Sequence, residues 1–431
     1  MLEKDTPRAL EEAIRSLEGQ FAALPEFSGA AAGPIAAVMG EVAARLGDNY
    51  PYFHPLYAGQ MLKPPHPVAR AAYALATWIN PNNHALDGGR ASSEMEREAV
   101  AQLAAMFGWR EHLGHLTGGG TMANLEALWV AGSLHPGKKI VASAQSHYTH
   151  QRISSVLQLP FAKVATEARG RMDPAALEEM LKQGDVGCVV ATLGTTATGS
   201  VDPLPEILAL RQRYGFRVHI DAAYGGYFTL ADNLGPETRS AFDRIREADS
   251  IVIDPHKHGL QPYGCGCVLF HDPGVGTLYK HDSPATYFSS RQQHLGEISL
   301  ECSRPGASAV ALWATLRVLP LAPGGAFAQS LASCRRAALA LHARLSADAR
   351  FVTPFPPQLD IAVWKPQKGS AQRIFDEAAR RNLHLALARL PGAFFGDPAP
   401  EILCLRSVLM KPEHEQWIDR IWEILDQAAN S

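Results

Sequence analysis

Residues 218–226, with the sequence VHIDAAYGG, carry the pattern that decides the expected fold. An apolar, β-prone run ends there in Asp221 and two small residues, as at the carboxyl end of a buried strand. The pattern returns at residues 250–257, SIVIDPHK, where a second apolar run ends in Asp254 and Lys257. Because open α/β sheets bind ligands outside the carboxyl ends of their strands, these two stretches predict a ligand site at such an edge.

Strand and helix patterns alternate along the neighbouring sequence. Further β-rich runs lie at residues 139–143, 188–193 and 267–270, and helical patterns lie at 173–183 and 204–214. This alternation predicts an α/β fold whose mixed sheet is mostly parallel.

Changes in amino-acid composition along the chain predict its division into domains. Proline and glycine interrupt the chain near residue 320, and a long helix rich in Ala, Leu and Arg follows. Within the large part, Ser93 and Glu96 fit a capping box that would open a helix over residues 94–106. We expect three parts: an N-terminal helical and extended arm over 1–60, a large domain over 61–324 and a small α+β domain over 325–431.

Composition argues against several classes of partner. The 431 residues carry a formal net charge of −3 without a basic run, so we expect no nucleic-acid partner. No apolar stretch approaches the roughly 18 residues of a membrane span. The charged N-terminus does not resemble a signal peptide, and the six scattered cysteines do not suggest a disulfide scaffold. We therefore expect a cytoplasmic protein with reduced thiols.

A glycine-rich stretch at residues 116–124, LTGGGTMAN, is a candidate phosphate site. Three glycines lead through Thr121 into a helical pattern, and helix N-termini present free N–H groups to anions. The stretch lacks the G-K-[S/T] ending of a Walker loop. The alternative is an ordinary turn before a helix.

Three side chains near strand ends suggest chemistry. A buried carboxylate at Asp221 needs a cationic partner such as a protonated pyridine nitrogen, although Asp also caps helices. Lys257 follows an apolar strand, where partial desolvation makes an amine more nucleophilic, although most lysines are solvated. His147 follows the strand at 139–143 and could stack on an aromatic ring, or lie at the surface as an ordinary hydrogen-bonded residue.

The order and spacing of five motifs resemble the group II amino acid decarboxylases, which belong to the fold type I enzymes that use pyridoxal 5′-phosphate (PLP). The motifs are TGGGTMAN at 117–124, SHY at 146–148, ATLGTT at 191–196, HIDAAYGG at 219–226 and DPHK at 254–257. The resemblance extends from about residue 54 to residue 410 and so covers most of the chain.

The resemblance implies roles for the cofactor site. PLP would be held as a Schiff base on Lys257, with Asp221 against its pyridine nitrogen. His147 would stack on one ring face and Ala223 would lie against the other. The phosphate would be held by Gly120, Thr121 and His256, with Asp254 as a weaker candidate, and Thr195 or Thr196 would approach the phenolic oxygen.

The resemblance also implies an L-amino acid as substrate and a homodimer with the active site at the subunit interface. The candidates for binding substrate are Gln60, His84 and Arg406, although Arg406 could instead form a structural salt bridge. The substrate could be aromatic or acidic, and the many rings of the arm slightly favour an aromatic one.

The chain departs from the family at the proton donor, so other outcomes stay open. The family's loop tyrosine aligns near His294 here, and Tyr287 is the nearest tyrosine. A histidine can act as the acid, but without any acid the carbanion would persist and react with oxygen, and an aldehyde would replace the amine. Residues 300–307, LECSRPGA, resemble the sphingosine-phosphate lyases, so carbon–carbon cleavage is an alternative, as is transamination.

Two further readings belong to other classes of protein. Cys265 and Cys267, with His256 and His258, suggest zinc only weakly, because a second cysteine pair at finger-like spacing is missing. We therefore expect no metal. A catalytically inactive homologue acting as a binding module is disfavoured because Lys257, Asp221 and His147 are all present.

Overall fold

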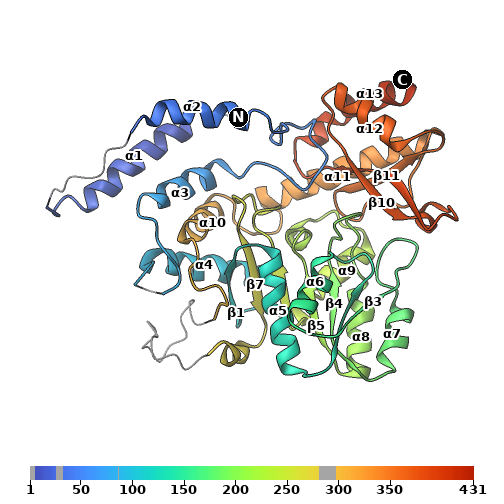
Figure 1. Cartoon of the computed structure of the whole chain (residues 1–431), viewed down its shortest axis with the longest axis horizontal. Helices are drawn as coiled ribbons and strands as arrows, with labels where there is room; N and C mark the ends of the chain where they lie inside the picture. Colours follow the sequence, from blue (N-terminus) through green and yellow to red (C-terminus); the bar gives the residue numbers. More distant parts are fainter. Residues whose placement is uncertain (1–4, 26–32, 86, 281–297) are drawn as a thin grey trace.

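The computed structural model describes residues 5–25, 33–85, 87–280 and 298–431. Its centre is a seven-stranded sheet in the order β1–β7–β6–β5–β4–β2–β3 (Figure 1). Strands β6, β5, β4, β2 and β3 pair in parallel, whereas β7 runs antiparallel to both β1 and β6. The predicted α/β class with a mostly parallel mixed sheet is therefore confirmed. The strands are β1 (Leu113–Thr117), β2 (Lys139–Ser143), β3 (Phe161–Val164), β4 (Val186–Thr192), β5 (Arg217–Asp221), β6 (Ser250–Ile253) and β7 (Gly266–Phe270).

Helices cover both faces of this sheet because alternate strand residues point to opposite sides. On β4, Cys188 and Val190 pack in the cluster that contains α6 (Thr149–Val156). Val189 and Ala191 pack in the larger cluster on the other face. Helix α5 (Gly120–Leu134) shares the α6 face. The larger cluster includes residues of α4 (Arg90–Met106), α7 (Pro174–Leu181), α8 (Leu204–Tyr214), α9 (Pro236–Asp243) and α10 (Gly306–Val318).

A second sheet, entirely antiparallel, is built from the last part of the chain in the order β10–β11–β9–β8. Its strands are β8 (Phe351–Val352), β9 (Ile361–Pro366), β10 (Ala386–Pro391) and β11 (Glu401–Val408), and its helices are α11 (Ala326–Ala347), α12 (Ala371–Arg380) and α13 (His414–Asn430). Short 3-10 helices are η1 (Gly226–Leu230), η2 (Ile245–Glu247), η3 (Pro273–Tyr279) and η5 (Gly392–Phe395). The predicted domain boundaries near residues 60 and 324 stay predictions.

The N-terminal part reaches across the molecule to the second sheet (Figure 1). It contains α1 (Asp5–Gln20), α2 (Ile35–Leu46) and α3 (Pro67–Thr77). Between α2 and α3, the N–H of Ala58 donates to the carbonyl of His384 at 2.8 Å, and the N–H of Val408 donates to the carbonyl of Ala58 at 2.8 Å. This segment, residues 56–60, is called the arm segment below.

One predicted helix boundary is wrong. Helix α4 begins at Arg90, not at residue 94, so Ser93 lies within the helix and caps nothing there. Glu96 is buried, accepts a hydrogen bond from the N–H of Leu116 at 2.9 Å and pairs with Arg304. Because this acidic side chain serves a tertiary contact, its spacing from Ser93 is not a capping signal. None of the helices described is both long and apolar enough to cross a membrane.

Candidate active site

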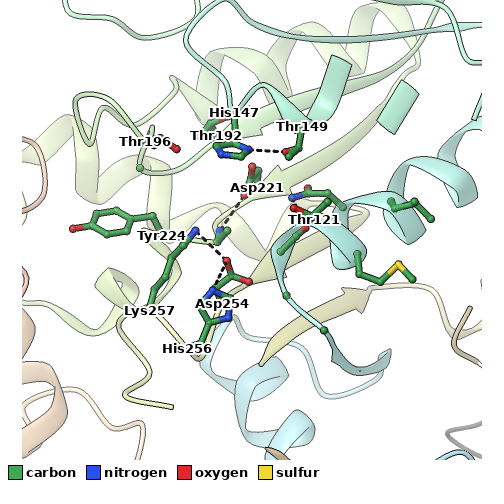
Figure 2. A pocket seen from close by; sticks show the side chains of 18 of the residues that line it. Thr121, His147, Thr149, Thr192, Thr196, Asp221, Tyr224, Asp254, His256 and Lys257 are labelled. Atoms are coloured by element: carbon green, nitrogen blue, oxygen red, sulfur yellow. Dashed lines mark hydrogen bonds and ion pairs between the residues drawn. The ribbon is translucent and has the colours of Figure 1, made fainter. Parts of the chain in front are cut away.

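A cavity of about 530 Å³ opens where the carboxyl ends of β4, β5 and β6 meet the start of α5 (Figure 2). It therefore lies at the sheet edge that the sequence predicted. The lining residues are Gly118, Gly119, Gly120, Thr121, Met122, Asn124, Leu125, His147, Thr149, Thr192, Gly194, Thr196, Asp221, Ala223, Tyr224, Asp254, His256, Lys257 and Glu301.

Asp221 ends β5 with a carboxylate that is almost completely buried yet faces this cavity. One oxygen, Oδ1, accepts from the N–H of Ala223 at 3.1 Å, and Oδ2 lies 2.8 Å from Nε2 of His150. Burial alone would raise the pKa of Asp221, but His150 and Lys257 hold that pKa below the usual range of a carboxyl group. The cavity wall thus presents a fixed negative charge.

Lys257 extends into the cavity from the loop that follows β6 (Figure 2). Its Nζ lies 3.0 Å from Oδ2 of Asp254, and Oδ1 of Asp254 is buried with no hydrogen-bond partner within residues 5–25, 33–85, 87–280 and 298–431. His256 lies beside this pair, with Nε2 at 3.5 Å from Oδ2 of Asp254 and Nδ1 at 2.8 Å from the carbonyl of Cys265. Asp254 therefore neutralises the lysine directly, a contact that the sequence did not reveal.

The glycine stretch forms the mouth of the cavity at the start of α5. Gly119 precedes the helix with φ of 141°, a backbone conformation open essentially to glycine. A Cβ on Gly120 would lie only 2.8 Å from Oδ2 of Asp254. No side chain caps the helix start, so its first N–H groups are available to an anion. Glu301 accepts from the N–H of Gly118 at 2.9 Å, which the sequence analysis missed.

His147 and two threonines complete the wall. Nδ1 of His147 lies 2.7 Å from Oγ1 of Thr149, and burial lowers the pKa of the imidazole, which favours the neutral ring. Thr196 lines the cavity, whereas Thr195 is fully buried and bonds to Thr198 at 2.8 Å. Of the two threonines considered from the sequence, the structure places Thr196 at the cavity and Thr195 in the turn behind it.

The three residues predicted to bind substrate do not line the cavity. Arg406 of β11 is buried and donates from Nη1 to the carbonyl of Gly59 at 3.2 Å and to Oε1 of Gln60 at 3.3 Å. These two residues of the predicted set therefore lie together, held by the arm segment. His84 lies elsewhere, where its N–H donates to Oδ1 of Asn82 at 3.2 Å. The predicted proton donors His294 and Tyr287 lie outside the described residues.

The cysteines near the site behave as packing residues. Cys265 and Cys267 are fully buried, and burial raises the pKa of both thiols, which disfavours the thiolate that binds zinc. Within the described part of the chain, no group of three or more His, Cys, Asp or Glu side chains is placed to hold a metal ion.

The residues of the cavity fit pyridoxal phosphate. Asp221 offers a buried carboxylate to a cationic ring nitrogen, and Lys257 offers an amine for covalent attachment. The uncapped start of α5 beside Gly119 and Gly120 suits a phosphate, because the helix dipole favours negative charge there. The small side chain of Ala223 leaves room for a flat ring next to Asp221.

Comparison with known proteins gives consistent matches. Residues 129–365 match the family model described as the pyridoxal-dependent decarboxylase conserved domain. A probable L-tyrosine/L-aspartate decarboxylase of Methanopyrus kandleri is 26% identical over 374 residues, covering 85% of this chain and 94% of that one. A protein of the same description from Methanothermobacter thermautotrophicus is 29% identical over 262 residues, covering 60% of this chain and 70% of that one.

A solved structure shares the whole fold. The crystal structure of Oryza sativa TDC with PLP and tryptamine superposes with a TM-score of 0.81 at 19% identity, covering 100% of this chain and 98% of that one. The two chains therefore share the same overall fold.

Proposed function

Since this chain belongs to the pyridoxal-dependent decarboxylase family and is a PLP-dependent amino acid decarboxylase, we propose that its substrate is an aromatic L-amino acid, with L-tyrosine the first to test. Bound PLP supplies a protonated ring that withdraws electrons from the α-carbon as carbon dioxide leaves. Lys257 would attach the cofactor, Asp221 would pair with its ring nitrogen, and His147 and Ala223 would lie against the ring. Gly120, Thr121 and His256 would hold the phosphate.

The charges of the residues that line the cavity favour an aromatic substrate over an acidic one. The described lining contains three carboxylates, Asp221, Asp254 and Glu301, and Lys257 is the one Lys or Arg among these lining residues. Lys257 already pairs with Asp254. A second carboxylate on an acidic substrate would meet repulsion rather than a cation in this lining. A neutral aromatic side chain avoids that cost. The descriptions of both relatives name L-tyrosine and L-aspartate together, so the charge of the lining is the argument for the aromatic one.

Arg406 is the candidate partner of the substrate's α-carboxylate. In the part of the chain that the structure describes, its Nε and Nη2 atoms are buried without a hydrogen-bond partner, and a guanidinium with such unpaired donors gains strongly from an anion. It lies near Tyr224, which lines the cavity. Arg406 and Gln60 lie outside the described lining, behind Tyr224, so a carboxylate that they hold would be fixed at that side of the cavity, which is what selective loss of that group requires.

We also propose a homodimer in the cytoplasm, with the active site at the subunit interface. Helix α2 supports the dimer because an apolar stripe lies exposed along one of its faces: Ile35, Val38, Met39, Val42 and Leu46 are each between 40% and 63% exposed. A second copy of the chain would cover this stripe. All six cysteines are free thiols, which fits a reducing compartment.

The test is the product spectrum. Purified protein loaded with PLP is incubated separately with L-tyrosine, L-tryptophan, L-phenylalanine, L-aspartate and L-glutamate, and products are followed by mass spectrometry. We expect tyramine or another aromatic amine, with Lys257→Ala inactive. Arg406→Met should raise KM for the aromatic substrate by about tenfold or more, because it removes a charged hydrogen-bond donor.

Other products would revise the proposal in distinct ways. Turnover of aspartate or glutamate alone would overturn the aromatic assignment. An aromatic aldehyde in place of the amine would show that protonation at the α-carbon fails, and a keto acid would indicate transamination. If none of the amino acids is consumed by protein that shows the absorbance of bound PLP, the proposed substrate class is wrong and carbon–carbon cleavage becomes the reaction to test.

A further inference from the structure

A buried histidine to which the sequence analysis gave no role contacts the carboxylate of Asp221. His150 lies in α6, one helical turn beyond His147, and is completely buried. Its Nε2 lies 2.8 Å from Oδ2 of Asp221. His147 lines the cavity and His150 does not, so the two imidazoles approach the site differently: one at the cavity wall, the other behind the carboxylate.

The hydrogen-bond pattern fixes the direction of this contact. Nδ1 of His150 is buried and has no hydrogen-bond partner among the described residues. The tautomer with hydrogen on Nε2 leaves no buried N–H unsatisfied, so we assign Nε2–H as the donor to Asp221. Asp221 then accepts one hydrogen bond on each oxygen, from His150 and from the N–H of Ala223. Both oxygens are thereby anchored from the protein side, and their remaining lone pairs are available to the cavity.

The neighbouring imidazole shows that this contact is specific. His219 lies on β5 two residues before Asp221, on the same face of the strand. Its Nε2 lies 2.8 Å from Oδ1 of Asn124 and its Nδ1 lies 2.8 Å from Oγ of Ser250. Both nitrogens of His219 are therefore engaged elsewhere, and His150 is the histidine that bonds to the carboxylate.

We propose that His150 is a positioning residue for the cofactor: its Nε2–H holds the Asp221 carboxylate in the orientation and the ionised form that select a protonated ring nitrogen. A carboxylate with one oxygen lacking its donor would rotate more freely, and in this buried setting it would take up a proton more readily. Either change would weaken the contact between Asp221 and the protonated ring nitrogen, because that contact depends on a full negative charge. This proposal rests on the family's cofactor and is independent of the substrate class.

The test compares two cofactors that differ at the ring nitrogen. Dissociation constants of PLP and of 1-deaza-PLP, in which C–H replaces that nitrogen, are measured by equilibrium dialysis for the wild-type protein and its variants. Attachment to Lys257 and phosphate binding are common to both cofactors. The ratio of their two dissociation constants therefore reports the contact between the ring nitrogen and Asp221. The variants are His150→Phe, which keeps a ring but no donor, and His150→Gln, whose amide nitrogen can reach the position of Nε2.

We expect the preference for PLP over 1-deaza-PLP to fall about tenfold or more in His150→Phe, as for loss of a hydrogen bond to a charged group. His150→Gln should keep the preference within about threefold of wild type. The matched control is His219→Gln, another buried histidine beside the same strand, which should leave the ratio unchanged. Far-UV circular dichroism checks that each variant is folded.

Two results would overturn the proposal. An unchanged ratio in folded His150→Phe would mean that His150 only fills space behind the site. If His150→Phe does not fold, His150→Gln is compared with His150→Asn, whose shorter side chain cannot reach Asp221. Equal preferences in those two variants would show that the donor at the Nε2 position has no role.

Discussion

At the scale of single residues, the buried Lys411 and the half-buried Lys63 link the chain in and just after the arm segment to the residues that follow β11. Nζ of Lys411 donates to the carbonyl of Tyr57 at 2.6 Å, and Nζ of Lys63 donates to the carbonyl of Met410 at 3.2 Å. Burial and, to a smaller extent, the charge of Lys63 lower the pKa of Lys411 to about 7, against the opposing effect of Glu413 and the Cys334 thiol. The attachment of the arm is therefore sensitive to pH.

This pKa predicts how stability changes with pH. Below about pH 7 the lysine is protonated in both the folded and the unfolded chain, and the folded state carries the full cost of the buried charge. Between pH 7 and about 10 only the unfolded chain keeps the proton, so the free energy of unfolding rises with pH. Relative to Lys411→Met, wild type should gain up to about 1.4 kcal/mol per pH unit over this range.

Urea unfolding of both proteins at pH 6.5, 7.5, 8.5 and 9.5 measures this difference. The control is Lys368→Met, because Lys368 is exposed and its removal should give a difference that does not vary with pH. A constant difference between wild type and Lys411→Met would mean that Lys411 keeps its proton in the folded protein.

Some residues of the site could be predicted from the sequence and others could not. Lys257, Asp221, His147 and Gly120 could be placed at one site because each follows a strand or opens a helix, and parallel strand ends converge. His150 and Glu301 could not, because their roles depend on which way a helix or loop turns a side chain. Adjacent threonines such as Thr195 and Thr196 cannot be separated by pattern alone, since the turn decides which faces the cavity.

At the scale of elements, α2 gives a test of the proposed dimer. Val38 lies at the centre of the exposed apolar stripe, and Ala44 lies on the opposite side of the same helix. A charge at Val38 would be buried in any interface that covers the stripe, whereas a charge at Ala44 would stay in water. We expect Val38→Asp to shift the protein toward the monomer and Ala44→Asp to have no effect.

Size-exclusion chromatography with light scattering at several protein concentrations distinguishes the two cases. If Val38→Asp remains as dimeric as wild type, the interface lies on another part of the chain and the stripe on α2 has a different role.

Elements were predicted best where their signals are local. Strand β2 and helix α8 have the predicted limits, and β5 ends at Asp221 as predicted, because apolar runs and turn residues mark these ends. The start of α4 was wrong because Glu96 pairs with Arg304, more than 200 residues away in the chain, instead of forming a capping box with Ser93. Strand β1, LGHLT, was not predicted because glycine and histidine weaken its β signal.

At the scale of the whole molecule, Asp360 joins the second sheet to the cofactor site. It is completely buried, accepts from the hydroxyl of Tyr224 at 2.7 Å and lies 3.2 Å from Nε2 of His258, the neighbour of Lys257. Local sequence patterns gave no sign of this link, because it joins residues that are more than 100 positions apart.

Removing this charge should destabilise the protein. Asp360→Asn keeps the size of the side chain but leaves buried polar groups with a weaker partner, so we expect a loss of about 3 kcal/mol in the free energy of unfolding. Asp397→Asn is the control, because Asp397 is partly exposed and lies 3.8 Å from Lys365, and such pairs contribute less than about 1 kcal/mol. Equal, small losses in the two variants would show that apolar packing alone joins the two sheets.

The docking of Ala58 between His384 and Val408 has a consequence for synthesis on the ribosome. Ala58 emerges 350 residues before Val408, which at about 5–20 residues per second is roughly 20 to 70 s of translation. Throughout that time the early segment has exposed backbone groups and no pairing partner. The pocket for the substrate's carboxylate, which Gln60 and Arg406 would form, is therefore among the last features to be assembled, so incomplete nascent chains can have the large sheet folded and still be unable to act on an amino acid.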